Sequence, residues 1–150
     1  EPAYQNLPFL QGLWRAHDPD VWSGNSEVFR MLSERILELG EALLAYDVVA
    51  EGIQYFPKDL RLRQLLALAL ARSGAAGPAN AELLRLYREG HRDEETLGLL
   101  ARTHKDLAGE AADIAEANQH LRHAFEGYEQ AYRATGGYWS GINAAIRAIL

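Results

Sequence analysis

Residues 26–59 read SEVFRMLSERILELGEALLAYDVVAEGIQYFPKD, and their pattern predicts how the whole chain is built. From Phe29 onward, apolar side chains recur at i, i+3, i+4 and i+7, the spacing that places them on one face of an α-helix. Ser26 can cap the start of this helix, and Gly40 ends it. A second run with the same periodicity follows and is closed by Pro57, because proline does not continue a helix. The stretch therefore predicts two helices joined by a short turn.

Small residues recur along the chain at fixed intervals. Ala45 follows Ser33 after 12 residues and Ala67 follows after a further 22, and Ala79 and Ala101 repeat the same two intervals. One full interval is 34 residues. A small side chain suits a point where two helices cross closely, because a larger one would push them apart. The spacing predicts a chain built from 34-residue helix pairs.

The rest of the sequence continues this pattern, and it lacks the alternation of apolar and polar residues that indicates strands. Ala124 takes the next small position 23 residues after Ala101, so about 11 residues are inserted, near 108–118. Further helices are predicted at about 7–15, 60–72, 79–89, 94–107, 117–135 and 138–150. We expect an all-α fold in a single domain, 1–150, with about three and a half repeats at 26–59, 60–93, 94–137 and 138–150.

Composition narrows the classes of protein to which the chain can belong. It is 48% apolar and 24% charged, as a folded protein is, and its net charge is −6. That charge disfavours binding to duplex DNA or to an anionic membrane. The absence of cysteine excludes disulfides, cysteine-bound zinc and iron–sulfur clusters. The chain begins at Glu1 and ends inside an apolar run, so we interpret it as a fragment of a longer protein and expect it to be cytoplasmic.

The 34-residue pattern resembles the tetratricopeptide repeat, with Phe29, Leu32, Ser33 and Ile36 in its first helix and Ala45 in its second. This resemblance implies a right-handed superhelix of antiparallel helix pairs. It also implies a concave groove that is lined by the first helix of each pair and is used for binding.

Two segments are similar to a more specific family. Residues 95–106 read ETLGLLARTHKD and residues 138–145 read YWSGINAA. Both resemble stretches of the TRAFs-binding domain, a tetratricopeptide-type domain that precedes the kinase in apoptosis-signal-regulating kinases and occurs in bacterial multidomain signalling proteins. The resemblance implies a bacterial signalling protein whose effector domain lies outside these residues. No kinase motif is present in the 150 residues.

Few residues of the chain suggest catalysis or a cofactor. No nucleophile elbow, metalloprotease helix or phosphate-binding glycine loop occurs, so we do not expect an enzyme. Glu116, His120 and His123 share one helical face and could present two nitrogens and one oxygen to a metal ion. We interpret them as a solvated face and expect neither a metal nor a cofactor. His17 and His91 are interpreted as ordinary surface residues.

The groove implied by the repeats contains the candidate binding residues. Arg61, Arg72, Arg102 and Lys105 are predicted to form a basic stripe that could bind an anion through charge-assisted hydrogen bonds. Gly98 would let a partner approach the backbone. The aromatic rings of Tyr138 and Trp139 offer stacking surfaces, and Asn143 is either a ligand contact or a structural hydrogen-bonder. In the alternative interpretation the basic residues form ordinary ion pairs with Glu94, Glu95 and Asp106.

These features predict a non-catalytic interaction module that binds a partner protein segment in its groove and regulates an effector. The alternative is a sensor of a small anionic ligand, such as a nucleotide second messenger. A third possibility is a spacer that forms homo-oligomers through its last helix, where Ile142, Ile146 and Ile149 recur at helical spacing.

Overall fold

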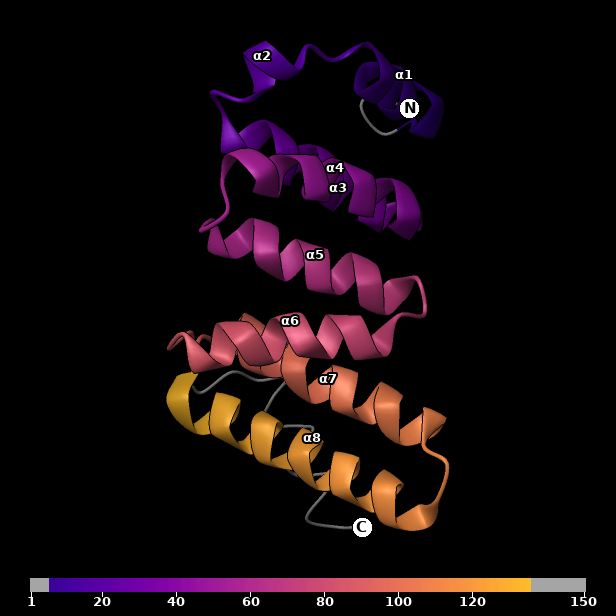
Figure 1. The fold of residues 1–150 in the computed structure, drawn as a ribbon, viewed down its shortest axis with the longest axis vertical. Helices are drawn as coiled ribbons and strands as arrows, with labels where there is room; N and C mark the ends of the chain where they lie inside the picture. The colour runs from indigo at the N-terminus through magenta and orange to yellow at the C-terminus, as the bar shows by residue number, and fades with distance from the viewer. Residues whose placement is uncertain (1–5, 136–150) are drawn as a thin grey trace. The chain divides into compact units, whose positions relative to one another are not determined.

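The computed structural model describes residues 6–135, and between them all regular secondary structure is helical (Figure 1). The all-α prediction is therefore confirmed. The chain divides into two compact units, one ending at Gly74 and the other beginning at Ala75. The first holds α1 (Leu7–Ala16), α2 (Pro19–Trp22), α3 (Ser26–Glu38), α4 (Ala42–Tyr55) and α5 (Leu60–Arg72), and the second holds α6 (Ala76–Arg88), α7 (Glu94–Glu110) and α8 (Ile114–Thr135).

In the first unit, α4 packs against both α3 and α5, and α1 and α2 lie against α3 (Figure 1). The core between these helices contains Phe29, Val48 and Leu62, all of which are fully buried. Gly52 of α4 lies directly against Phe29 of α3, and a Cβ atom at Gly52 would be only 2.8 Å from Cγ of that ring. The close packing of α3 on α4 therefore depends on glycine at this position.

In the second unit, α7 packs against both α6 and α8 (Figure 1). Ala101 of α7 faces Gly127 of α8, where an added Cβ would lie 3.1 Å from the Cβ of Ala101. The α7–α8 pair is thus held close by small residues. The small positions of the 34-residue pattern are all buried, as predicted: Ser33, Ala45, Ala67, Ala79, Ala101 and Ala124.

A glycine, Gly40, ends α3, as expected from the sequence. Gly40 has a φ of +85°, and its N–H donates to the carbonyl of Leu37 (3.0 Å) while Glu41 N–H donates to the carbonyl of Ile36 (3.2 Å). These two bonds form a Schellman motif, which satisfies carbonyls that the helix leaves unpaired. Gly90 ends α6 in the same way, with a φ of +102°.

Polar side chains cap the starts of several helices. At α3 the cap is Asn25, whose side chain accepts a hydrogen bond from Glu27 N–H (3.0 Å). Ser26 is the first residue inside that helix, so its assignment as the cap was wrong by one position. Asp93 caps α7, accepting bonds from both the backbone N–H (3.1 Å) and the hydroxyl (2.7 Å) of Thr96. Such a cap stabilises a helix by about 1 kcal/mol.

One buried polar contact joins α6 to α7. The side-chain amide of Asn80 donates to the hydroxyl of Thr103 (3.0 Å), which in turn donates to the carbonyl of Leu100 (2.8 Å). Both side chains are almost inaccessible to water. Since unpaired buried polar groups are costly, this bond fixes how far one helix is displaced along the other.

Several helix boundaries differ from those predicted. α6 begins at Ala76 rather than Ala79, because Pro78 is tolerated within the first turn of a helix. α7 extends to Glu110 rather than 107, and α8 begins at Ile114 rather than 117, so residues 108–118, which we expected as an insertion, form the end of α7, a short connection and the start of α8. The predicted helix at 138–150 lies outside the described residues. No helix between residues 6 and 135 combines the length and the apolar character needed to cross a membrane.

Candidate functional site

The exposed surface of α7 carries two of the predicted cations, Arg102 and Lys105. Between residues 6 and 135, neither side chain forms an ion pair. The expected alternative pairing with Glu94, Glu95 or Asp106 is therefore not seen for these two residues. Two cations three positions apart on one helix lie near each other, so both can contact the same anion. We call Arg102 and Lys105 the α7 cation pair.

The α7 cation pair lies beside Tyr128 of α8. The Lys105 ammonium is 5.8 Å from the centre of the Tyr128 ring, within reach of a cation–π interaction. Burial raises the pKa of the Tyr128 phenol above its ordinary value, the positive charge of Arg102 opposes that rise, and Asp106 adds to it. The phenol is consequently neutral at physiological pH and leaves both cations available to a ligand.

Gly98 lies one helical turn before Arg102 on α7. It is half-buried, and no atom of a neighbouring element lies within 4 Å of the point where a Cβ would be. Within the part of the chain that the structure describes, nothing packs against the backbone at this point. No contact among these residues requires a glycine in the interior of this helix, where alanine would stabilise it by about 1 kcal/mol.

The other two predicted cations belong to the first unit and are already engaged. Arg61 Nε donates to Glu34 Oε1 (2.8 Å), and Arg72 Nη1 donates to the backbone carbonyl of Leu37 (3.2 Å). Both interactions link α5 to α3, so these side chains have a structural role within their unit. The predicted contacts Tyr138, Trp139 and Asn143 lie outside the described residues.

The interpretation of His17 as an ordinary surface residue was wrong. Its ring stacks on Trp14 with centroids 4.1 Å apart and planes within 9° of parallel, and the ring of Trp22 lies 4.6 Å away. His17 Nε2 is also 2.6 Å from Glu51 Oε2 of α4. His17 thereby attaches the connection between α1 and α2 to α4. No sequence pattern indicates this contact, because Glu51 lies 34 residues away.

Two of the residues that we interpreted as a solvated face, His120 and His123, contact a third histidine that the sequence analysis did not single out. Glu116 accepts a hydrogen bond from Ala112 N–H (3.1 Å) at the start of α8. His104 of α7 instead lies against the two histidines, with its Nδ1 3.2 Å from His120 Nδ1 and its ring centre 5.2 Å from that of His123. Within residues 6–135, no three ligating side chains are yet gathered closely enough to hold a metal ion.

Burial also sets the protonation state of His104. The pKa of His104 falls from 6.5 to about 4, chiefly because burial disfavours the charged ring, with smaller effects from His123 and His120. The ring is therefore neutral at pH 7. Sequence reasoning missed this residue because helical periodicity relates positions within one helix, whereas His104 meets its partners across the α7–α8 interface.

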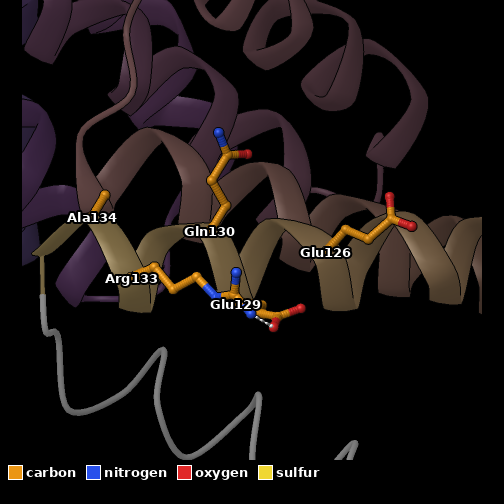
Figure 2. A pocket seen from close by; sticks show the side chains of 5 residues that line it. All are labelled: Glu126, Glu129, Gln130, Arg133 and Ala134. Carbon is orange, nitrogen blue, oxygen red and sulfur yellow. Dashed lines mark hydrogen bonds and ion pairs between the residues drawn. The ribbon is translucent and has the colours of Figure 1, made fainter.

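Two hollows were not predicted from the sequence. One, of about 440 Å³, lies along α8 (Figure 2), where Arg133 pairs with Glu129 at 2.6 Å and Glu126 lies near the preceding turn. Carboxylates outnumber cations among its described lining residues, so this lining disfavours an anion. The other, of about 390 Å³, is apolar and lies between α1 and α3, lined by Phe9, Leu10, Leu13, Val28, Met31, Leu32 and Arg35.

Comparison with known protein families identifies the type of repeat in this chain. A family model described as Tetratricopeptide Repeats-Sensor matches residues 37–148, about three quarters of the chain. This chain belongs to the Tetratricopeptide Repeats-Sensor family. The match includes α4–α8 and the α7 cation pair, while α1, α2 and most of α3 precede it. No curated protein and no solved structure matched the chain. The Tetratricopeptide Repeats-Sensor assignment supports a repeat-based sensor or interaction module.

Proposed function

We propose that this chain is a non-catalytic module that binds a segment of a partner protein in its repeat groove and thereby regulates an effector domain outside these 150 residues. The observation that carries the proposal is the α7 cation pair, Arg102 and Lys105, which is exposed and forms no ion pair within residues 6–135. Gly98 lies one helical turn before it, and no described side chain covers the point where its Cβ would be. The partner segment is acidic, because it must supply carboxylates to these two cations.

Each part of this surface has a distinct task in the proposal. Arg102 and Lys105 bind carboxylates, and the missing side chain at Gly98 lets the partner backbone lie close to α7. Tyr138, Trp139 and Asn143 stay proposed as further contacts on the sequence alone, whereas Arg61 and Arg72 are engaged within the first unit. A charge-assisted hydrogen bond that is shielded from water contributes about 1.5–3 kcal/mol, so the α7 cation pair can carry much of the binding energy.

The test is fluorescence anisotropy with a panel of labelled acidic peptides and their amide-substituted counterparts. Arg102→Ala should weaken binding by about tenfold or more with little change in fold stability, because Arg102 is exposed. Arg122→Ala, which removes an exposed arginine from α8, is the matched control and should bind like the parent. Unchanged binding by Arg102→Ala would refute the proposed site.

A second variant separates the effect of a substitution on partner binding from its effect on the stability of the fold. Gly98→Ala adds a methyl group where no neighbouring atom lies within 4 Å, so it should stabilise α7 by up to about 1 kcal/mol. If the partner backbone approaches Gly98, the same change weakens binding in a protein that is more stable than the parent. Equal affinity would show that no partner approaches α7 at this point.

The alternative function is a sensor of a small anionic ligand such as a nucleotide second messenger. Two observations favour keeping it: the family description names a sensor, and the α7 cation pair suits a phosphate as well as a carboxylate. Calorimetry with nucleotides distinguishes the two. Saturable binding of a nucleotide, lost in Arg102→Ala, would replace the partner segment with a small ligand as the occupant.

The resemblance to the TRAFs-binding domain supports the regulatory part of the proposal, because that domain accompanies effector domains in bacterial signalling proteins. We also propose that residues 138–150 complete a fourth, partial repeat and can join two copies of the chain through Ile142, Ile146 and Ile149. Sedimentation velocity tests this: a Ile146→Asp variant should be monomeric at concentrations where the parent self-associates, and a parent that stays monomeric refutes it.

A further inference from the structure

Three histidines from two helices meet at the interface between α7 and α8. His104 comes from α7, while His120 and His123 are three residues apart on α8 and so lie on neighbouring positions of one face. Ring centres of His104 and His120 are 5.4 Å apart, and those of His104 and His123 are 5.2 Å apart. His104 contacts both of the other two rings and is buried, whereas His120 is partly buried and the side chain of His123 is half-exposed. A metal ion could therefore reach the cluster from solvent through His123.

The separation of two ring nitrogens is the decisive measurement. His104 Nδ1 and His120 Nδ1 are 3.2 Å apart. Two nitrogens bound to one tetrahedral zinc ion at about 2.0–2.1 Å are roughly 3.3–3.4 Å apart, as the tetrahedral angle requires. The two histidines therefore already have nearly the nitrogen separation that a single metal ion needs, and little movement of α7 against α8 would be required.

The third proposed ligand, His123, is close, and its Nδ1 is near a different partner. His123 Nδ1 lies 3.9 Å from Glu126 Oε2, a long contact between two side chains that are each about half exposed. Such a contact contributes little, so the His123 ring can rotate toward His104 at small cost. Glu126 then remains nearby as a negative charge that offsets the incoming cation. In the structure as described for residues 6–135, three donors are not gathered, so the site requires this rotation of His123.

We propose that His104, His120 and His123 form a site for one divalent transition-metal ion, of the class that prefers imidazole nitrogen, such as Zn²⁺ or Cu²⁺. Imidazole nitrogen is a ligand that these ions prefer. A bound ion joins α7 to α8 and so stabilises the helix pair that also carries the α7 cation pair. This site is separate from the proposed partner surface and does not depend on it.

The test is a calorimetric titration of untagged, metal-free protein with zinc chloride at pH 7.5, repeated with copper chloride. One ion should bind per chain. His104→Gln, His120→Gln and His123→Gln should each weaken binding by about tenfold or more, as expected for the loss of one ligand. His91→Gln, which alters a histidine in the α6–α7 connection, is the matched control and should bind like the parent.

Two further measurements make the result decisive. Imidazole ¹⁵N chemical shifts should identify Nδ1 of both His104 and His120 as the nitrogens that change on adding zinc. His123→Gln alters a half-exposed side chain, so it should fold normally even if substitution of His104 impairs folding. The proposal is overturned if no saturable 1:1 binding occurs or if His123→Gln and His120→Gln bind like the parent, and the His104–His120 contact is then an ordinary hydrogen bond.

Discussion

Replacing Gly52 with alanine tests how closely α4 crosses α3. The new Cβ would lie 2.8 Å from Cγ and 2.9 Å from Cβ of Phe29, well inside van der Waals contact. Phe29 is fully buried, with the rings of Trp22 and Tyr55 beside it, so it has little room to move away. Overpacking of this kind costs about 1–3 kcal/mol of unfolding free energy.

A second effect acts in the opposite direction and must be separated from the first. Alanine is better than glycine in a helix interior by about 1 kcal/mol, so the net loss for Gly52→Ala is about 0–2 kcal/mol. Gly12→Ala supplies the control, because Gly12 lies in a helix of the same unit and its Cβ would meet no atom within 4 Å. The difference between the two variants isolates the overpacking cost.

Urea unfolding followed by tryptophan fluorescence measures this difference. Trp14 and Trp22 both lie in the first unit, and replacing Trp139 with phenylalanine in all variants restricts the signal to that unit. We expect Gly52→Ala to be less stable than Gly12→Ala by about 1–3 kcal/mol. Equal stability of the two variants would refute the argument that Gly52 sets the approach of α4 to Phe29.

Three further predictions address other contacts. Ala101→Leu should cost about 1–3 kcal/mol, because Ala101 is fully buried against α8, and an unchanged melting temperature would contradict the small-residue register. Glu51→Gln should lower the stability of the first unit by about 1 kcal/mol by weakening the hydrogen bond with His17, and a His17→Phe background should reduce that effect in a double-mutant cycle. With a chelator present, stability should be highest above about pH 6.5 and fall toward pH 4, because the pKa of His104 is lowered to about 4 and the unfolded chain takes up its proton first; a flat profile in the parent would contradict this.

The repeat architecture was predictable because its signals are local and periodic. Ser33, Ala67 and Ala101 are equally spaced in the sequence, and all three are buried in the structure. Gly40 was recognisable as a helix end because few other residues adopt its positive φ. The exact ends of helices were less certain where two neighbouring residues are both suited to the N-cap position. Asn25 and Ser26 are both good caps, and the sequence does not distinguish between them.

The contacts that were missed join residues on different helices. His17 meets Glu51, and His104 meets His120, through tertiary packing that periodicity within one helix does not reveal. The same limit applies to the proposed binding surface. Four cations were predicted from the sequence to bind a ligand. Their ion pairs, such as that of Arg61 with Glu34, were not predictable, because the partner of a long flexible side chain depends on which helices pack together.

The hydrogen bond between Asn80 and Thr103 restricts how the second unit can respond to a ligand. Sliding α7 along α6 by one turn, about 5.4 Å, would leave a buried amide and a buried hydroxyl without partners. Rotation of α7 about a line near this contact keeps the bond intact and is much less costly. If ligand binding at the surface of α7 moves this helix, we therefore expect α7 to rotate relative to α6 about the Asn80–Thr103 contact rather than to slide along it.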